Sequence, residues 1–277
     1  MNKPLIILAG GVSSRMKQSE SAKITDKQRS EADTRSKGLL NINGRPFLDY
    51  LLIHAEQAGF EDVIFLISHF SNEIETVYGK RFKSLRVHYA MQDLLIGMTK
   101  PAGTADALLQ VMNQFPNLQY ADFLVCNSDN LYSVNALRQL RETNYSNACI
   151  AYDRDALNFE AERISKFAIL DIEAETLRQI IEKPSVNDID RFRLPDSSVR
   201  VSMNIFKFSG ANIYPYLRDC PFSERNEKEL PTAIQMMIRQ SSHKMHTILL
   251  SEPVTDLTQK DDISRVENEL KTLPDSE

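Results

Sequence analysis

The chain has 277 residues, with 33 basic and 38 acidic side chains and therefore a formal net charge of −5. This balance argues against a protein that binds nucleic acid through its phosphates, because such binding depends on clustered cationic side chains. Hydrophobic residues make up 42% of the chain and charged residues 26%, which is typical of globular domains and excludes disorder throughout.

Short β-branched runs alternate with helical patterns through the first half of the chain, which is typical of βαβ units on a mostly parallel sheet. The first strand is expected over 4–9. The first helix is expected over 45–58, where apolar residues follow a helical stripe that ends at Gly59. The next helix should have Ser71 as its N-cap. The other elements expected here are strands at 63–67, 86–90 and 121–126 and helices at 71–78 and 104–112.

The segment 17–36 departs from this alternation. It has 20 residues with one large aliphatic side chain, Ile24, against five basic and four acidic side chains. Such a segment cannot bury enough apolar surface to offset its ordering entropy, so we expect a mobile loop. A solvated insertion is the simpler interpretation. A lid is the alternative, because long loops at the mouth of an active site are often functional.

The second half of the chain is less regular. A turn at 171–173 should separate two of its strands, and 199–208 is expected to form one continuous strand. No repeat is present, so the simplest account is one α/β domain with an elaborated second half. The other elements expected here are strands at 148–152, 165–170, 177–181 and 246–250 and helices at 212–217, 229–240 and 261–270.

The strongest motif lies directly after the first strand, where Ala9, Gly10 and Gly11 lead to Arg15. Glycines there let the backbone approach an anion closely, and successive N–H groups form an anion-binding concavity at the carboxyl end of a strand. Arg15 adds a permanently charged, forked donor for phosphate oxygens. The glycine spacing fits neither a Walker loop nor the dinucleotide-binding fingerprint, and an ordinary tight turn is the alternative.

Further motifs follow in chain order: Ser36-Lys37-Gly38 before Asn43-Gly44-Arg45-Pro46, Gly103-Thr104-Ala105 at a helix start, Asn127-Ser128-Asp129 at a strand end, Glu182-Lys183-Pro184, and Asp256 before the last helix. In this order and spacing the chain resembles the sugar-nucleotide pyrophosphorylases, the sugar-1-phosphate nucleotidyltransferase family. The resemblance extends from Leu5 to about Leu270.

The resemblance implies a reaction in which a sugar 1-phosphate oxygen attacks the α-phosphorus of an NTP in line, giving an NDP-sugar and pyrophosphate. Arg15 and Lys37 would be the catalytic residues, with Arg15 on the departing pyrophosphate and Lys37 near the α-phosphate. Without the surrounding pattern, Lys37 would be interpreted as an ordinary solvated lysine. The nucleotide-binding residues that the resemblance implies are Ala9, Gly10, Gly11, Gln92, Gly103 and Thr104, with Gln92 at the base.

The resemblance assigns Asp129 and Asp256 to Mg²⁺, which takes one or two carboxylates together with phosphate oxygens and water. A helix cap is the alternative for Asp129. In this family the Glu of Glu-Lys-Pro contacts sugar hydroxyls and the Lys contacts the sugar phosphate, which here implies Glu182 and Lys183. Asn204 lies inside an apolar run and needs a hydrogen-bond partner, which a sugar ligand or the protein core could supply.

The implied fold is a single three-layer, Rossmann-like α/β nucleotidyltransferase domain with a mixed central sheet over residues 1–277. Residues 1–152 would form its nucleotide-binding half and residues 153–277 its sugar-binding half and closing helix, with the boundary near 153–163. The expected ligands are an NTP, a sugar 1-phosphate and Mg²⁺, without nucleic acid or membrane, and a homo-oligomer stays open. Two alternatives remain: a nucleotidyltransferase for a non-sugar phosphate such as phosphocholine or a polyol phosphate, and a non-catalytic regulatory protein that binds nucleotide sugars.

The cellular compartment follows from two further patterns. No apolar run approaches the roughly 18 residues of a membrane span, and the apolar segment that starts at Leu5 is too short for a signal-peptide core. Cys126, Cys149 and Cys220 are far apart and odd in number, which indicates neither a disulfide framework nor a zinc site. We therefore expect a cytoplasmic protein.

Overall fold

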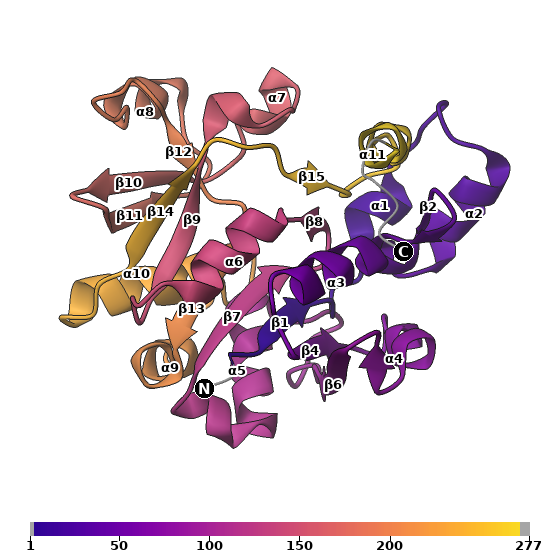
Figure 1. Ribbon diagram of the computed structural model, residues 1–277, viewed down its shortest axis with the longest axis horizontal. Coiled ribbons are helices and arrows are strands. Elements are labelled where there is room, and N and C mark those ends of the chain that lie inside the picture. The colour runs from indigo at the N-terminus through magenta and orange to yellow at the C-terminus, as the bar shows by residue number, and fades with distance from the viewer. Residues whose placement is uncertain (1–2, 272–277) are drawn as a thin grey trace.

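The computed structural model describes residues 3–271, and residues 1, 2 and 272–277 lie outside the described part. Its centre is a twisted sheet of 11 strands (Figure 1). In spatial order these strands are β12 (Arg200–Val201), β10 (Ile169–Glu173), β11 (Thr176–Ile181), β14 (His246–Leu250), β9 (Ala148–Asp153), β13 (Ile205–Ser209), β7 (Asp122–Asn127), β1 (Leu5–Leu8), β4 (Asp62–Ile67), β6 (Leu85–Met91) and β5 (Arg81–Phe82).

The sheet is mixed, as predicted. Strands β7, β1, β4 and β6 are parallel neighbours, so their carboxyl ends meet at one edge. Strand β13 pairs antiparallel with both β7 and β9 and thereby joins the two halves of the sheet. Beyond it, β12 pairs with β9 as well as with β10, so the pairings β9–β12–β10–β11–β14–β9 form a closed circuit.

Helices cover both faces of the sheet and complete the three predicted layers (Figure 1). The sheet has a hydrophobic core on each face, and successive side chains of β1 point to opposite faces. Leu5 and Ile7 belong to one hydrophobic cluster and Ile6 to the other. Each cluster contains residues from both halves of the chain. The first face carries α3 (Phe47–Gln57), α4 (Glu73–Tyr78), α6 (Val134–Glu142) and α11 (Asp262–Leu270), and the second carries α5 (Thr104–Gln114), α9 (Gly210–Arg218) and α10 (Leu230–Gln240).

Several short elements connect these strands and helices. Two small antiparallel pairs occur outside the main sheet. The short elements are α1 (Ser14–Gln18), α2 (Asp26–Thr34), α7 (Ala161–Ile164), α8 (Val186–Arg191), the 3₁₀ turns Lys37–Leu39, Pro116–Gln119 and Arg154–Ala156, and the pairs β2 (Asn41–Ile42) with β3 (Arg45–Pro46) and β8 (Asn130–Leu131) with β15 (Thr255–Asp256).

The expected loop at 17–36 is wrong in its central part, because residues 26–34 form helix α2. Thr25 and Gln28 form a reciprocal capping box at its start. Ala32 is fully buried, and the Gln28 amide donates to Glu267 of α11 at 2.8 Å. Composition alone missed this helix, since its stability comes from a cap and from a partner surface more than 200 positions away in the sequence.

Three local predictions are also wrong. Residues 171–173 continue strand β10, and the turn lies at Ala174 and Glu175, both with positive φ. The segment 199–208 is not one strand: it breaks at Asn204, whose φ of 56° is incompatible with a strand. Ser71 does not cap α4, which begins at Glu73, because the Ser71 hydroxyl instead accepts from the Ser68 N–H at 3.0 Å.

No helix within residues 3–271 has both the length and the apolar character needed to cross a membrane. The predicted division at 152 and 153 stays a prediction, although β9 ends at Asp153 and the 3₁₀ turn Arg154–Ala156 follows directly.

Candidate functional site

A cavity of about 310 Å³ lies at the carboxyl ends of the parallel strands. This is the edge at which open α/β sheets bind ligands, because the loops that follow the strands converge there. Its lining combines the loop after β1, the start of α5, the end of β7 and the 3₁₀ turn that contains Lys37. Nine residues expected from the sequence line it together: Ala9, Gly10, Gly11, Arg15, Lys37, Gln92, Gly103, Thr104 and Asp129.

The loop after β1 has the open backbone expected of an anion site. A Cβ on Gly10 would come within 2.7 Å of Gln92 Oε1, so only glycine fits there without moving that side chain. The Ser68 hydroxyl donates to the Gly10 carbonyl at 2.7 Å and fixes the turn. Helix α1 then begins at Ser14 and carries Arg15, whose guanidinium has no hydrogen bond or ion pair with another residue of 3–271.

Gln92 is held in one orientation at the wall of the cavity. It is 3% exposed, and its backbone N–H donates to the Ile67 carbonyl at 2.7 Å. Its amide Nε2 donates to the Asp106 carboxylate at 3.1 Å. Because an ionised carboxylate only accepts hydrogen bonds, Oε1 is the atom of Gln92 that is left beside Gly10 as an acceptor.

Gly103 joins the start of α5 to the segment that follows α9. Its φ of +101° lies in a region that side chains rarely adopt, and a Cβ there would come within 2.6 Å of the Lys228 carbonyl oxygen. The Lys228 N–H donates to the Ala102 carbonyl at 2.6 Å, and the Ala105 N–H donates to the Lys228 carbonyl at 2.8 Å. This close backbone contact places Thr104 at the cavity.

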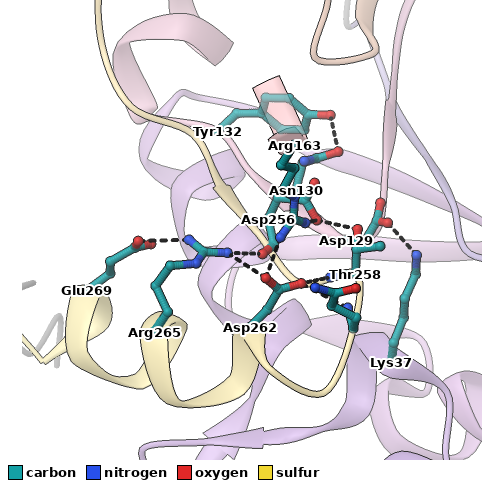
Figure 2. A network of polar contacts seen from close by, with 11 residues as sticks. Lys37, Asp129, Asn130, Tyr132, Arg163, Asp256, Thr258, Asp262, Arg265 and Glu269 are labelled. Atoms are coloured by element: carbon teal, nitrogen blue, oxygen red, sulfur yellow. Dashed lines mark hydrogen bonds and ion pairs between the residues drawn. The ribbon is translucent and has the colours of Figure 1, made fainter. Parts of the chain in front are cut away.

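Of the two carboxylates assigned to a metal, Asp256 lies on β15, and Asp129 directly precedes β8, the strand that pairs with β15. In the β8–β15 pair Asp256 lies opposite Asn130, the residue after Asp129, and the Leu257 N–H donates to the Asp129 carbonyl at 2.8 Å. Figure 2 shows the resulting network, in which the Lys37 ammonium forms an ion pair with the Asp129 carboxylate. Residues far apart in the sequence are thus brought to one strand end.

Asp256 lies in a buried, electrostatically crowded position. Its carboxylate accepts from the Thr258 hydroxyl at 2.5 Å and forms an ion pair with Arg163 at 3.0 Å. Burial and the neighbouring charge of Asp129 raise its pKa. Burial alone would also raise the pKa of Asp262, but its ion pair with Arg163 and backbone N–H donors outweigh burial and lower that pKa.

Sequence reasoning missed Arg163 and the partners around it. Arg163 comes from α7 and pairs with both Asp256 and Asp262, whereas Arg265 donates to the Asp256 backbone carbonyl at 2.6 Å (Figure 2). No sequence pattern marks Arg163, because it lies in an irregular segment without a recognisable spacing to Asp256. Asp262 stood in a visible run of acidic residues, but its two bonds to the Thr258 and Gln259 N–H groups are visible only in the structure.

The three residues expected at a sugar phosphate do not line this cavity. Glu182 and Lys183 follow β11 and have exposed side chains. Asn204 is also exposed, which rules out the interpretation as a core asparagine. Its backbone carbonyl accepts from the Tyr132 hydroxyl at 3.3 Å, so it lies near the strand end that carries Asp129.

The donor chemistry at Asp129 and Asp256 fits a divalent cation of the hard, oxygen-preferring type. Both side chains are 11% exposed, and their mutual repulsion raises the pKa of Asp256, a penalty that a cation between them would relieve. Within residues 3–271 no group of three or more His, Cys, Asp or Glu side chains is arranged to hold a metal. Two carboxylates are nevertheless sufficient when phosphate oxygens complete the coordination.

The fold and this cavity agree with the comparison against family models. The chain belongs to the family of MobA-like NTP transferase domains, whose model matches residues 5–187. The resemblance to nucleotidyltransferases found in the sequence is therefore confirmed.

Two curated relatives extend this comparison. A D-glycero-alpha-D-manno-heptose 1-phosphate guanylyltransferase of Aneurinibacillus thermoaerophilus is 26% identical over 141 residues, covering 51% of this chain and 52% of the relative. A bifunctional sugar-1-phosphate nucleotidylyltransferase/acetyltransferase of Sulfurisphaera tokodaii is 23% identical over 214 residues, covering 76% of this chain and 45% of the relative. The matched part therefore spans about half the length of these relatives.

Solved structures show the same fold. A UDP-glucose pyrophosphorylase complexed with UDP-glucose superposes with a TM-score of 0.72 at 16% identity, covering 98% of this chain and 99% of the other. A structure described as a putative glucose-1-phosphate thymidylyltransferase from Bacillus anthracis superposes with a TM-score of 0.68 at 18% identity, covering 99% and 96%. At these identities the likeness confirms the three-layer α/β architecture.

Proposed function

We propose that this protein transfers a nucleotidyl group from an NTP to the phosphate of a sugar 1-phosphate, giving an NDP-sugar and pyrophosphate with Mg²⁺. The observation that carries the proposal is the cavity at the carboxyl ends of β1 and β7, where the glycine loop lies beside the Lys37–Asp129 ion pair. Family membership and the curated relatives support the reaction class.

Each step of the transfer has a group in this cavity. An acceptor phosphate oxygen would form a bond to the α-phosphorus, while the bond from that phosphorus to the bridging oxygen breaks and pyrophosphate leaves with the electron pair. Arg15, free of protein partners within residues 3–271, would bind the pyrophosphate oxygens. Lys37 would move from Asp129 to the α-phosphate, where its compact ammonium neutralises the developing charge.

Asp129 and Asp256 would hold Mg²⁺, which supplies charge neutralisation at the phosphates when bound. At the acceptor, Glu182 would contact sugar hydroxyls and Lys183 the sugar phosphate, with Asn204 beside them. Support for this assignment is the exposure of all three side chains.

The experiment that tests the proposal is a screen of ATP, CTP, GTP and UTP against phosphorylated acceptors, with released pyrophosphate as the readout. The acceptors should include glucose 1-phosphate, heptose 1-phosphate, phosphocholine and a polyol phosphate. Release with a sugar 1-phosphate is the expected result, and release only with a non-sugar phosphate would identify the alternative nucleotidyltransferase. Binding of an NDP-sugar without release from any pair would refute turnover and identify a regulatory protein.

Gly10→Ala should raise the KM for the NTP about tenfold, because the added methyl forces Gln92 away from its place between Gly10 and Asp106. Steady-state pyrophosphate release measures this change. Gly11→Ala is the matched variant for folding, since its Cβ would meet no atom within 4 Å in the described part of the chain, its two neighbours aside. Both variants should melt near the parent temperature. An unchanged KM for Gly10→Ala would show that Gln92 does not contribute to the nucleotide site.

A further inference from the structure

Lys260 is a buried cation between the last helix and the segment 17–36. It is 3% exposed, yet its ammonium donates to the backbone carbonyls of Ser19 at 2.8 Å and Lys17 at 3.2 Å. It also forms an ion pair with Asp33 of α2 at 2.6 Å. The backbone N–H of Lys260 donates to the Ser19 hydroxyl at 3.0 Å, so one residue makes four contacts to this segment.

These contacts end on the helix that carries Arg15. Helix α1 spans only Ser14–Gln18, and its last carbonyls have no partner further along the helix. The Lys260 ammonium donates to one of them, the Lys17 carbonyl, and to the carbonyl of the C-cap residue Ser19, and its positive charge interacts favourably with the helix dipole. A helix this short has little stability of its own, so its position depends on such tertiary contacts.

Lys260 also lies close in sequence to Asp256. Lys260 lies four positions after Asp256, in a turn that is closed by the Asp262 carboxylate on the Thr258 and Gln259 N–H groups. Lys260 therefore links the fixed turn after Asp256 to helix α1, which carries Arg15. Figure 1 shows α11 beside α1 and α2, although these elements lie at opposite ends of the sequence.

We infer that Lys260 is a positioning residue that holds Arg15 at the pyrophosphate end of the nucleotide site. This inference rests on the proposed function, since it takes Arg15 to bind pyrophosphate oxygens. Lys260 itself would not touch the ligand. It acts by fixing the end of α1, and through α1 the direction of the Arg15 side chain.

A double-mutant cycle tests the inference with inorganic pyrophosphate and Mg²⁺ as the probe, so neither the base nor the acceptor needs to be known. Calorimetry gives the Kd for the parent, Lys260→Met, Arg15→Ala and the double variant. Lys260→Met and Arg15→Ala should each weaken binding about tenfold, and the double variant should bind no more weakly than Arg15→Ala. Such non-additivity would not arise if Lys260 only stabilised the fold.

Two further variants keep the result interpretable. Lys271→Met, which changes an exposed lysine just after α11, should leave the Kd unchanged. Lys260→Gln can still donate a hydrogen bond to a carbonyl, so its Kd should lie between those of the parent and Lys260→Met. Circular dichroism shows whether Lys260→Met folds. If it does not, Lys260→Gln takes the place of Lys260→Met in the cycle.

An unchanged Kd in the folded Lys260 variant, or a double variant about 100-fold weaker, would overturn the inference. A parent chain that does not bind pyrophosphate would overturn both the inference and the proposed phosphate site. A parent chain that binds pyrophosphate but releases none from any NTP would refute the proposed catalysis alone, and the cycle would still decide the role of Lys260.

Discussion

Turnover is expected to fall about 100-fold or more when Asp129 is replaced by asparagine, while the fold is retained. Asparagine keeps the shape of the side chain but removes a negative oxygen ligand, and it also removes the carboxylate that pairs with Lys37. A cation at a phosphoryl centre contributes several kcal/mol of charge stabilisation, and each 1.4 kcal/mol is tenfold in rate. Pyrophosphate release at saturating substrates measures the loss.

Asparagine substitutions at other carboxylates test whether the loss of turnover comes from removing a metal ligand or from any loss of one negative charge. Asp256→Asn should also lose turnover by orders of magnitude, and excess Mg²⁺ should restore part of it in either variant. Asp155→Asn, at an exposed carboxylate whose only ion pair within residues 3–271 is with Arg154 at 3.6 Å, should keep the parent rate. Near-full activity of Asp256→Asn at limiting Mg²⁺ would show that this residue is not a metal ligand and that the last motif is misassigned.

Gly103→Ala is expected to lower the free energy of unfolding by roughly 3 kcal/mol or more. Two penalties combine there: alanine at a φ of +101° is strained, and its methyl would meet the Lys228 carbonyl oxygen at 2.6 Å. The two nearest atoms, the Lys228 carbonyl oxygen and amide nitrogen, take part in two backbone hydrogen bonds at the start of α5, so they cannot move cheaply. Urea denaturation measures the loss, and the KM for the NTP should rise in the same variant.

Gly44→Ala isolates the first of these penalties. Its φ is +93°, but within residues 3–271, its two chain neighbours aside, no atom lies within 4 Å of the added methyl. Only the backbone strain of about 1–3 kcal/mol therefore applies. Equal destabilisation by the two variants would contradict the proposed contact between Gly103 and Lys228.

Local sequence patterns predict the glycine loop and Asp129, whereas Lys37, Gln92, Gly103 and Thr104 were expected at the site from the family resemblance. A glycine pair after a buried strand, and a carboxylate such as Asp129 at the end of another, both follow from strand boundaries, and the carboxyl ends of parallel strands must converge. Local patterns could not predict that Asp129 and Asp256 lie close together, since β8 and β15 are only two residues long and carry no strand pattern. That pairing came from the family resemblance.

The parts that the sequence could not predict depend on partners distant in the chain. Helix α2 has a polar composition typical of a loop, and only its cap and its contact with Glu267 show why it is helical. The break at Asn204 lies inside a continuous apolar run, and the hydrophobic pattern does not indicate it. The break occurs where the chain passes from β12, beside β10, to β13, beside β7. Arg163 likewise has its role fixed by Asp256 and Asp262, about 90 to 100 positions later.

The position of β13 in the sheet constrains the order in which the protein can form. Strand β7 is complete at Asn127, but its second neighbour comes from Ile205–Ser209, so a chain emerging from the ribosome leaves that edge unpaired while about 80 further residues are made. An unpaired edge of buried, apolar sequence is prone to join another chain. The site closes later still, when Asp256 pairs beside Asn130. Synthesis of this protein therefore includes a long interval in which chaperone protection of the β7 edge would matter most.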